Sequence, residues 1–413
     1  MSREYEHHKN VGRMTPDAEL AAKAAVENLL QWEAAVNEIH QWPEYSPQPM
    51  WSLDNRARNL KLEKLYYKDE SQRFGRQLGS FKALGAPYAV YALLADEVEA
   101  KTGKRPTADQ LRSHEFHSIT ERVTVCVATD GNQGRGLAYA AKVFGCRCVI
   151  YVHGHVSPGR KEAMEALGAI VIRINGEYEA SVARAKEDGR INNWHFVSST
   201  SWDNFKEGLP RNVMNAYMVM VEEALEALPS DSRITHVFMQ GGVGSIAAAV
   251  FLGFAKKYPG KTPRFVIVEP TEADCLFQSA INGRPTPSAG SLHTLMAGLA
   301  CREVSPAAWS VLQWLASDFI KIPDHWVVSA MRALADGGGD TPIVSGESAS
   351  GGMGVLLQSM LNPELRDQLG LDENSQVLLF GCEGATDPQI YEQVVGLSSH
   401  EVFERQAERA PAG

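Results

Sequence analysis

The sequence lacks the features of a membrane, secreted or nucleic-acid-binding protein. No stretch of its 413 residues approaches the roughly 20 consecutive apolar residues that cross a bilayer. The first nine residues are mostly polar or charged, without the apolar run of a secretory signal. A formal net charge of -10 leaves no basic surplus to meet phosphates, which argues against nucleic acid as a partner. We therefore expect a cytoplasmic protein that acts on a small molecule, with neither membrane nor nucleic acid as its partner.

Cysteine is also scarce, and its distribution does not indicate a disulfide framework. The six cysteines are scattered, and several lie in apolar runs that are typical of strands. This pattern favours buried, reduced thiols in a cytosolic protein. Cys146 and Cys148 are separated by one residue on an expected strand, so their side chains face opposite sides. We therefore predict no metal site there or elsewhere.

The sequence does contain the alternating pattern of an α/β protein. Its length suits two domains, and 44% hydrophobic with 22% charged residues is ordinary for a globular chain. Short β-branched runs alternate with longer amphipathic stretches, which predicts open, mostly parallel sheets flanked by helices. The runs are nearly continuous in apolar residues, so the strands are expected to be buried on both faces. The clearest expected strands are 123–127, 148–152, 170–174, 235–239, 265–268 and 377–380.

Three polar loops follow expected strands, at the end of the strand where parallel sheets bind ligands. They are residues 128–136, 240–245 and 381–388. Each joins a strand to a helix-like pattern, so each exposes backbone amides near a helix N-terminus.

Lys82 lies in an unusual setting for a lysine. It follows Phe81 and precedes small, apolar residues at the expected start of a helix. An amine held against such surroundings loses solvation, which makes its neutral, nucleophilic form accessible. Schiff-base chemistry with an aldehyde requires that form. The alternative is a helix-start lysine with no special role.

The loop at 240–245 has the character of a phosphate site. Glycines allow the backbone to approach an anion, and the following helix contributes a favourable field at its N-terminus. The loop lacks the lysine of a nucleotide P-loop, and a tight turn that uses glycine for packing is the alternative. The candidate phosphate contacts are Gly241, Gly242, Val243, Gly244 and Ser245.

The other two loops offer polar groups for a ring. Asn132 has an amide donor that can hold a phenolate oxygen. Asp130 is either an acid/base group near a reactive carbon or a helix cap. Cys382 can hydrogen-bond a pyridine nitrogen without forcing its protonation, or it is simply a small buried cysteine.

Taken together, these groups describe the contacts of one ligand. An aldehyde partner, a phosphate site, a donor for a phenolic oxygen and a partner for a ring nitrogen all match pyridoxal 5'-phosphate. Each motif is weak by itself, and their agreement favours this cofactor.

The motifs resemble those of the fold-type II, tryptophan synthase β-like pyridoxal-phosphate enzymes. The similarity rests on Ser80-Phe81-Lys82, on 129–133 and on 241–244, and extends from about Tyr67 to Tyr391. It implies two α/β domains with the active site between them. The expected large, cofactor-binding domain is 1–88 plus 210–413, with a small domain, 89–209, inserted. The resemblance also implies that Lys82 holds the cofactor, that Phe81 lies beside it, and that the protein is a homodimer.

Within that group the chain resembles the diaminopropionate ammonia-lyases. The shared motifs are 130–136, 346–349 and 383–388. This resemblance implies that Asp130, where threonine dehydratases usually have serine, helps to move the Cα proton. Those lyases carry a second active-site aspartate at the place that Ser199 occupies here. Serine offers a second ammonium group only a neutral hydrogen bond, so a related β-substituted amino acid is a possible substrate.

The resemblance implies α,β-elimination of ammonia from an amino acid, which gives an α-keto acid such as pyruvate. The expected substrate contacts are Thr129, Asp130, Gly131 and Ser199. A threonine or serine dehydratase and a β-replacement synthase of the same fold are the alternatives. A non-catalytic amino-acid sensor is a further alternative, although a sensor has no need of a Schiff-base lysine.

Overall fold

The computed structural model describes residues 4–14, 32–129, 131–176, 178–201 and 208–409. The chain divides into two compact units. Unit 1 comprises Met1–Leu30, Pro47–Ser80 and Met220–Gly413, and unit 2 comprises Gln31–Ser46 and Phe81–Val219. The expected division into 1–88 plus 210–413 and an inserted 89–209 stays a prediction. Among the described residues, no helix has both the length and the apolar character needed to span a membrane.

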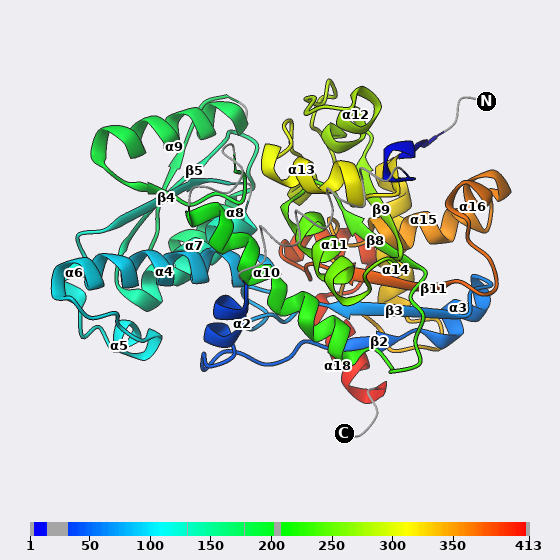
Figure 1. Ribbon diagram of the computed structural model, residues 1–413, viewed down its shortest axis with the longest axis horizontal. Coiled ribbons are helices and arrows are strands. Elements are labelled where there is room, and N and C mark those ends of the chain that lie inside the picture. Colours follow the sequence, from blue (N-terminus) through cyan, green and yellow to red (C-terminus); the bar gives the residue numbers. More distant parts are fainter. Residues whose placement is uncertain (1–3, 15–31, 130, 177, 202–207, 410–413) are drawn as a thin grey trace. The chain divides into compact units, whose positions relative to one another are not determined.

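Unit 1 is built on a mainly parallel sheet with the strand order β1-β10-β9-β8-β11-β3-β2 (Figure 1). The two edge strands, β1 and β2, are antiparallel to their neighbours. The five inner strands are all parallel to one another. The strands are β1 (Glu6–Lys9), β2 (Met50–Ser52), β3 (Lys64–Asp69), β8 (His236–Gln240), β9 (Arg264–Pro270), β10 (Asp318–Ile322) and β11 (Gln376–Gly381).

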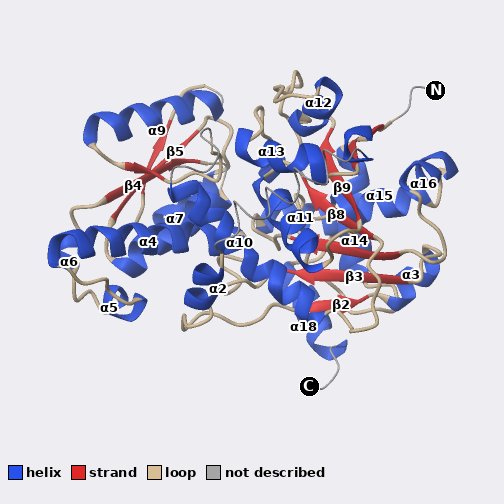
Figure 2. Cartoon of the chain, in the orientation of Figure 1, coloured by secondary structure: helices blue, strands red, loops and turns tan. Residues whose placement is uncertain are grey.

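Unit 2 contains a smaller, wholly parallel sheet with the order β6-β5-β4-β7. Its strands appear in red in Figure 2 and are β4 (Thr124–Ala128), β5 (Arg147–Val152), β6 (Ile170–Arg173) and β7 (His195–Phe196). Every residue of β4 is buried, as its continuous apolar pattern predicts. The predicted α/β class and the parallel sheets are therefore confirmed.

Helices cover both sheets. In unit 1 they are η1 (Val11–Met14), α3 (Asp54–Asn59), α11 (Ser245–Lys257), α12 (Cys275–Asn282), η2 (Ala297–Leu299), α13 (Pro306–Leu315), α14 (Asp324–Asp336), α15 (Gly351–Ser359), α16 (Pro363–Leu369), α17 (Pro388–Val395) and α18 (Ser399–Arg409). In unit 2 they are α2 (Glu33–Ile39), α4 (Lys82–Thr102), α5 (Ala108–Arg112), α6 (His117–Thr120), α7 (Asn132–Phe144), α8 (Pro158–Glu165) and α9 (Tyr178–Asn192). Helix α10 (Gly208–Ala227) has residues in both units.

Several helices begin at an N-cap residue followed directly by proline, a pair that can be recognised in the sequence. In each case a small polar side chain accepts a hydrogen bond from a backbone N–H in the first turn, and proline occupies the first helical position. Proline suits that position because its missing N–H would have no partner within the helix. The pairs are Ser157-Pro158, Ser305-Pro306, Asn362-Pro363 and Asp387-Pro388.

Candidate active site

The sheet of unit 1 brings two of the predicted loops together. From β8 the chain proceeds outward through β9 and β10, and then returns to place β11 on the other side of β8. The loops that follow β8 and β11 therefore diverge from the same edge, and ligands bind at such a reversal of strand order. Gln240, at the end of β8, donates hydrogen bonds to the carbonyls of Phe380 (2.7 Å) and Ala349 (2.8 Å). These bonds fix the end of β8 against the end of β11 and against the segment that contains Ala349.

The glycine loop has the geometry that close backbone approach requires. Gly242 and Gly244 have φ angles of 66° and 94°, which favour glycine. Gly244 immediately precedes α11, whose first ten residues are buried. The first backbone N–H groups of α11 have no partner within the helix and lie where the loop ends. This arrangement suits a phosphate group.

A buried glutamate packs directly behind this loop. A Cβ added at Gly241 would lie 2.4 Å from Cγ of Glu269, so no larger residue fits there without displacement. The Glu269 carboxylate accepts hydrogen bonds from the backbone N–H groups of Leu276 (3.1 Å) and Phe277 (2.7 Å) in α12. The Cys275 thiol donates to the carbonyl of Gly242 at 3.4 Å. Glu269 and α12 therefore support the glycine loop from behind.

The protonation of Glu269 gives a testable pH dependence. Burial raises the pKa of this carboxyl to about 8, and the two backbone donors offset only part of that effect. Because the folded protein holds the proton more tightly than the unfolded chain, this group stabilises the fold most at acidic pH. Its contribution decreases as the pH rises from the ordinary value of 4.5 towards 8.

Replacing Glu269 by glutamine should remove this dependence, because the amide does not titrate. Urea unfolding between pH 5 and pH 9, roughly the range of the shift, should show wild-type stability falling by several kcal/mol relative to the variant. The control is Glu272→Gln. This partly exposed carboxylate lies at the start of the connection between β9 and α12 and accepts hydrogen bonds from Ser291. Parallel pH profiles for wild type and Glu269→Gln would contradict this account.

The loop after β11 carries Cys382, which is buried and donates its thiol to the carbonyl of Ser348 at 4.0 Å. The backbone N–H of Ser348 donates to Oε1 of Glu383 (3.0 Å), which fixes the 346–349 segment against this loop. The backbone N–H of Gly384 donates to the carbonyl of Gly79 at 2.9 Å, and Ser80 forms an isolated bridge with Glu383. The chain that leads into Lys82 is therefore tied to the Cys382 loop.

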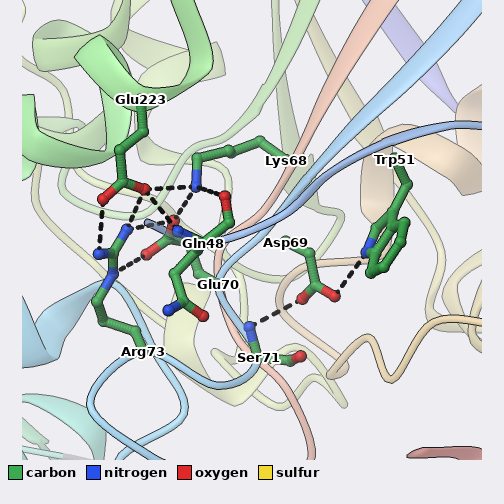
Figure 3. A network of polar contacts seen from close by, with 8 residues as sticks. All are labelled: Gln48, Trp51, Lys68, Asp69, Glu70, Ser71, Arg73 and Glu223. Atoms are coloured by element: carbon green, nitrogen blue, oxygen red, sulfur yellow. Dashed lines mark hydrogen bonds and ion pairs between the residues drawn. The ribbon is translucent and has the colours of Figure 1, made fainter. Parts of the chain in front are cut away.

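A buried ionic network fixes the start of the connection from β3 to α4, which ends at Lys82. Glu223 of α10 accepts hydrogen bonds from Lys68 (2.7 Å) and from both terminal nitrogens of Arg73 (2.9 and 2.7 Å) (Figure 3). Glu70 accepts from Lys68 and from Arg73 at 2.7 to 2.9 Å. Two cations and two anions, all buried, therefore balance in charge. Lys68 also donates to the carbonyl of Gln48 at 2.9 Å, so the network joins three separate segments.

The sheet of unit 2 has a reversal of its own at the predicted asparagine loop. The chain proceeds from β4 through β5 to β6, and then places β7 on the other side of β4. The loop after β4 contains Thr129, Gly131 and Asn132, and the loop after β7 contains Ser199. Because β4 and β7 are parallel, both loops leave from the same edge of the sheet. Asp130 lies outside the described residues.

Thr129 has a local structural task in this loop. Its Oγ1 accepts hydrogen bonds from the backbone N–H groups of Gly131 (3.0 Å) and Gly134 (3.2 Å). The threonine therefore caps the start of α7, which begins at Asn132. Its role in substrate binding, like that of Gly131 and Ser199, stays a prediction.

Lys82 is the first residue of α4, as the sequence predicts, and its side chain is half-buried. Helix α7 packs closely against this point. A Cβ added at Gly136 would lie 2.9 Å from the Lys82 carbonyl oxygen, so only glycine allows the approach. Phe81 is buried and packs edge-on against Tyr217 of α10, with ring centroids 4.8 Å apart. Within unit 2, α7, which follows the asparagine loop, and Tyr217 of α10 therefore both pack against the start of α4.

No sequence motif points to Glu223, Glu269 or Tyr217. Tyr217 and Glu269 follow or lie within apolar runs, and Glu223 stands beside Glu222 on the same helix. Glu223 and Tyr217 are recognised only through their contacts with Arg73 and Phe81, which are distant in the sequence. Glu269 is recognised only because it is buried.

The residues present fit pyridoxal phosphate. Unit 1 provides a glycine cradle that a Cβ would obstruct, together with the N-terminus of α11 and a buried thiol. Unit 2 provides a lysine and an asparagine at the ends of two packed helices.

Comparison with known proteins agrees with this set of groups. The family described as "Pyridoxal-phosphate dependent enzyme" matches residues 42–382. This chain belongs to that family. Its cofactor is therefore pyridoxal phosphate, and it is an enzyme with a small-molecule substrate.

Curated relatives and solved structures narrow the similarity. Diaminopropionate ammonia-lyase of Salmonella typhimurium is 36% identical over 365 residues, which cover 86% of this chain and 89% of the relative. The enzyme of that name from Escherichia coli strain K12 is 34% identical over 363 residues, 87% and 89% of the two chains. The holo crystal structure of the Escherichia coli enzyme superposes with a TM-score of 0.82 at 31% identity, covering 96% of this chain and 97% of that one.

Proposed function

We propose that this protein is a pyridoxal-phosphate-dependent ammonia-lyase. It eliminates ammonia from 2,3-diaminopropionate or a related β-substituted amino acid and yields an α-keto acid. The observation that carries the proposal is the placement of the predicted loops at the strand-order reversals of both sheets. Relatives with this activity cover most of the chain, and one was crystallised with an aminoacrylate–pyridoxal phosphate azomethine reaction intermediate, at a TM-score of 0.79.

In this proposal, each group has one task. The amine of Lys82 would hold the cofactor through its aldehyde, and it would take the Cα proton of the bound amino acid. The N-terminus of α11, with Gly241 to Ser245, binds the phosphate. Asn132 would hold the phenolic oxygen of the cofactor, and Cys382 would be a neutral partner for its ring nitrogen. The bound cofactor supplies an electron sink for the carbanion formed at Cα.

The substrate is held by the loops of unit 2. Backbone amides near Thr129, Gly131 and Asn132 bind its carboxylate, and Ser199 contacts its β substituent through a neutral hydrogen bond. Asp130 moves a proton on the face opposite Lys82 or protonates the leaving amine. We further propose that the protein is a cytoplasmic homodimer, a state that static light scattering would test.

The direct test of this function is an assay for keto acid and ammonia with D and L forms of 2,3-diaminopropionate, serine and threonine. Release of both products from diaminopropionate at the highest kcat/KM supports the proposal. Faster turnover of serine or threonine would identify a dehydratase. A requirement for a second nucleophile would identify a β-replacement synthase, and binding without turnover would identify a sensor.

Asp130→Asn separates the two tasks considered for this residue. If the carboxylate moves a proton, the variant should lose about 10²-fold or more in kcat for one enantiomer of the substrate and much less for the other. The control is Asp109→Asn in the first turn of α5, which keeps its helix and lies outside the site. Equal and small losses for both enantiomers would identify Asp130 as a helix cap.

A further inference from the structure

Tyr217 packs against Phe81, the residue before Lys82, and against Gly85 in the first turn of α4. Its ring meets Phe81 at an interplanar angle of 61°. A Cβ added at Gly85 would lie 2.7 Å from Cε1 and 3.1 Å from Cζ of Tyr217, so the ring lies directly on the backbone of α4. Glycine at position 85 is what allows this contact. Tyr217 therefore lies against the face at the start of α4 that carries Phe81 and Gly85, which flank Lys82 in the sequence.

The hydroxyl of Tyr217 is buried, and it has no hydrogen-bond partner within the part of the chain that the structure describes. Leaving a buried hydroxyl unsatisfied costs roughly 1–3 kcal/mol. Phenylalanine would fill the same space against Phe81 and Gly85 without that cost. A buried hydroxyl that has no partner among the described residues, and that lies beside the first turn of α4, is a candidate for contact with a ligand held there.

A second buried polar group lies on α7, the helix whose Gly136 contacts the Lys82 carbonyl. Both amide atoms of Gln133 are buried and have no partner among the described residues. Gln133 lies one turn before Gly136 on α7, and Gly136 is the residue that contacts the Lys82 carbonyl. Buried polar atoms that lack a partner among the described residues thus occur on both α7 and α10, the two helices that pack against the start of α4.

We propose that the Tyr217 hydroxyl belongs to the active site and donates a hydrogen bond to the cofactor or to the amino acid joined to it. The inference rests on the proposed function, because it needs a ligand at Lys82. Burial raises the pKa of this phenol far above its ordinary value, so the group stays protonated across the working range. Tyr217 is therefore a fixed donor that orients the ligand, and it does not carry protons.

The test compares Tyr217→Phe with Tyr391→Phe. Tyr391, in α17 of unit 1, is also fully buried in a hydrophobic core with a hydroxyl that lacks a partner among the described residues. Both variants remove one such hydroxyl and keep the ring. Tyr391→Phe therefore shows how much the loss of a buried hydroxyl alone changes stability, binding and kinetics. Each is examined by urea unfolding without cofactor, by absorbance titration with pyridoxal phosphate, and by steady-state kinetics.

Tyr217→Phe should be as stable as wild type or more stable without cofactor. It should bind pyridoxal phosphate or the substrate about tenfold more weakly, or lose about tenfold in kcat, the effect of one buried hydrogen bond. Tyr391→Phe should keep wild-type affinity and kinetics. A Tyr217→Phe variant with wild-type affinity, KM and kcat would overturn this inference alone. A wild-type protein that takes up no cofactor would overturn the proposed function as well.

Discussion

Lys82→Ala is expected to lose the visible absorption of the lysine-bound cofactor and to lower kcat for ammonia release by roughly three orders of magnitude or more. The lysine has two tasks in the proposed reaction, since it binds the aldehyde and then takes the Cα proton. Alanine can do neither. Helix propensity does not oppose the change, because alanine is the best helix former and the residue opens α4. The fold should therefore survive, which far-ultraviolet circular dichroism would confirm.

The matched control is Lys101→Ala in the last turn of the same helix. Lys101 is exposed, and among the described residues its one ion pair is with Glu97 at 3.7 Å. Such pairs contribute little, so this variant should keep its spectrum and its kcat. A Lys82→Ala protein that retains the absorption band and turnover would refute the assignment of the lysine.

The second large effect concerns stability and is expected from Glu223→Gln. The change removes one of the two carboxylates that pair with Lys68 and Arg73 among the described residues, and it leaves Glu70 in place. An uncompensated buried charge costs about 3–5 kcal/mol, so the midpoint of urea unfolding should fall accordingly. Glu226→Gln, an exposed position one turn further along α10, should change stability by less than about 0.5 kcal/mol. Equal stabilities for the two variants would show that the network contributes nothing.

This network should also make the stability of the fold depend on pH. Burial opposes ionisation of Glu223, but Arg73 and Lys68 overcome it and lower the pKa of the carboxyl to about 2. The stabilisation is therefore present above the ordinary value of 4.5 and is lost as the pH falls towards 2. Glu223→Gln should lack this loss, so the stability curves of the two proteins should converge in acid. Curves that stay parallel would contradict the lowered pKa.

The network matters for function because of where it lies in the chain. It fixes Lys68, Glu70 and Arg73, and the connection that starts there ends at Lys82. The bond from Gly384 to Gly79 fixes the other end. Glu223→Gln is therefore expected to weaken cofactor binding as well as the fold.

The sequence predicted the local features of this protein well. Residues 123–127, 235–239 and 377–380 were expected as strands, and the observed strands differ by about one residue at each end. Such strands can be predicted because their sequences are β-branched and apolar at nearly every position, a pattern typical of strands buried on both faces. The glycine loop and the start of α4 were legible for a related reason, since glycines and a helix-start lysine are local signals.

The features that sequence reasoning missed depend on contacts between distant segments. Strand β1 has two histidines in four residues and forms only because it pairs with β10, more than 300 residues away. Glu223 looks like one of several glutamates on α10 until Arg73 is seen to lie against it. Tyr217 looks like an ordinary core residue until its hydroxyl is found without a partner in the described chain. Periodicity and motifs cannot reveal such pairs.

The central claim is that Lys82 carries the cofactor, and borohydride reduction of the purified wild-type protein tests it most directly. Reduction makes the bond between amine and aldehyde permanent, so digestion and mass spectrometry locate the modified residue. We predict the mass of the reduced cofactor on the peptide that contains Lys82, and its loss when Lys82 is replaced by alanine. Modification of a different lysine, or of none, would contradict the account.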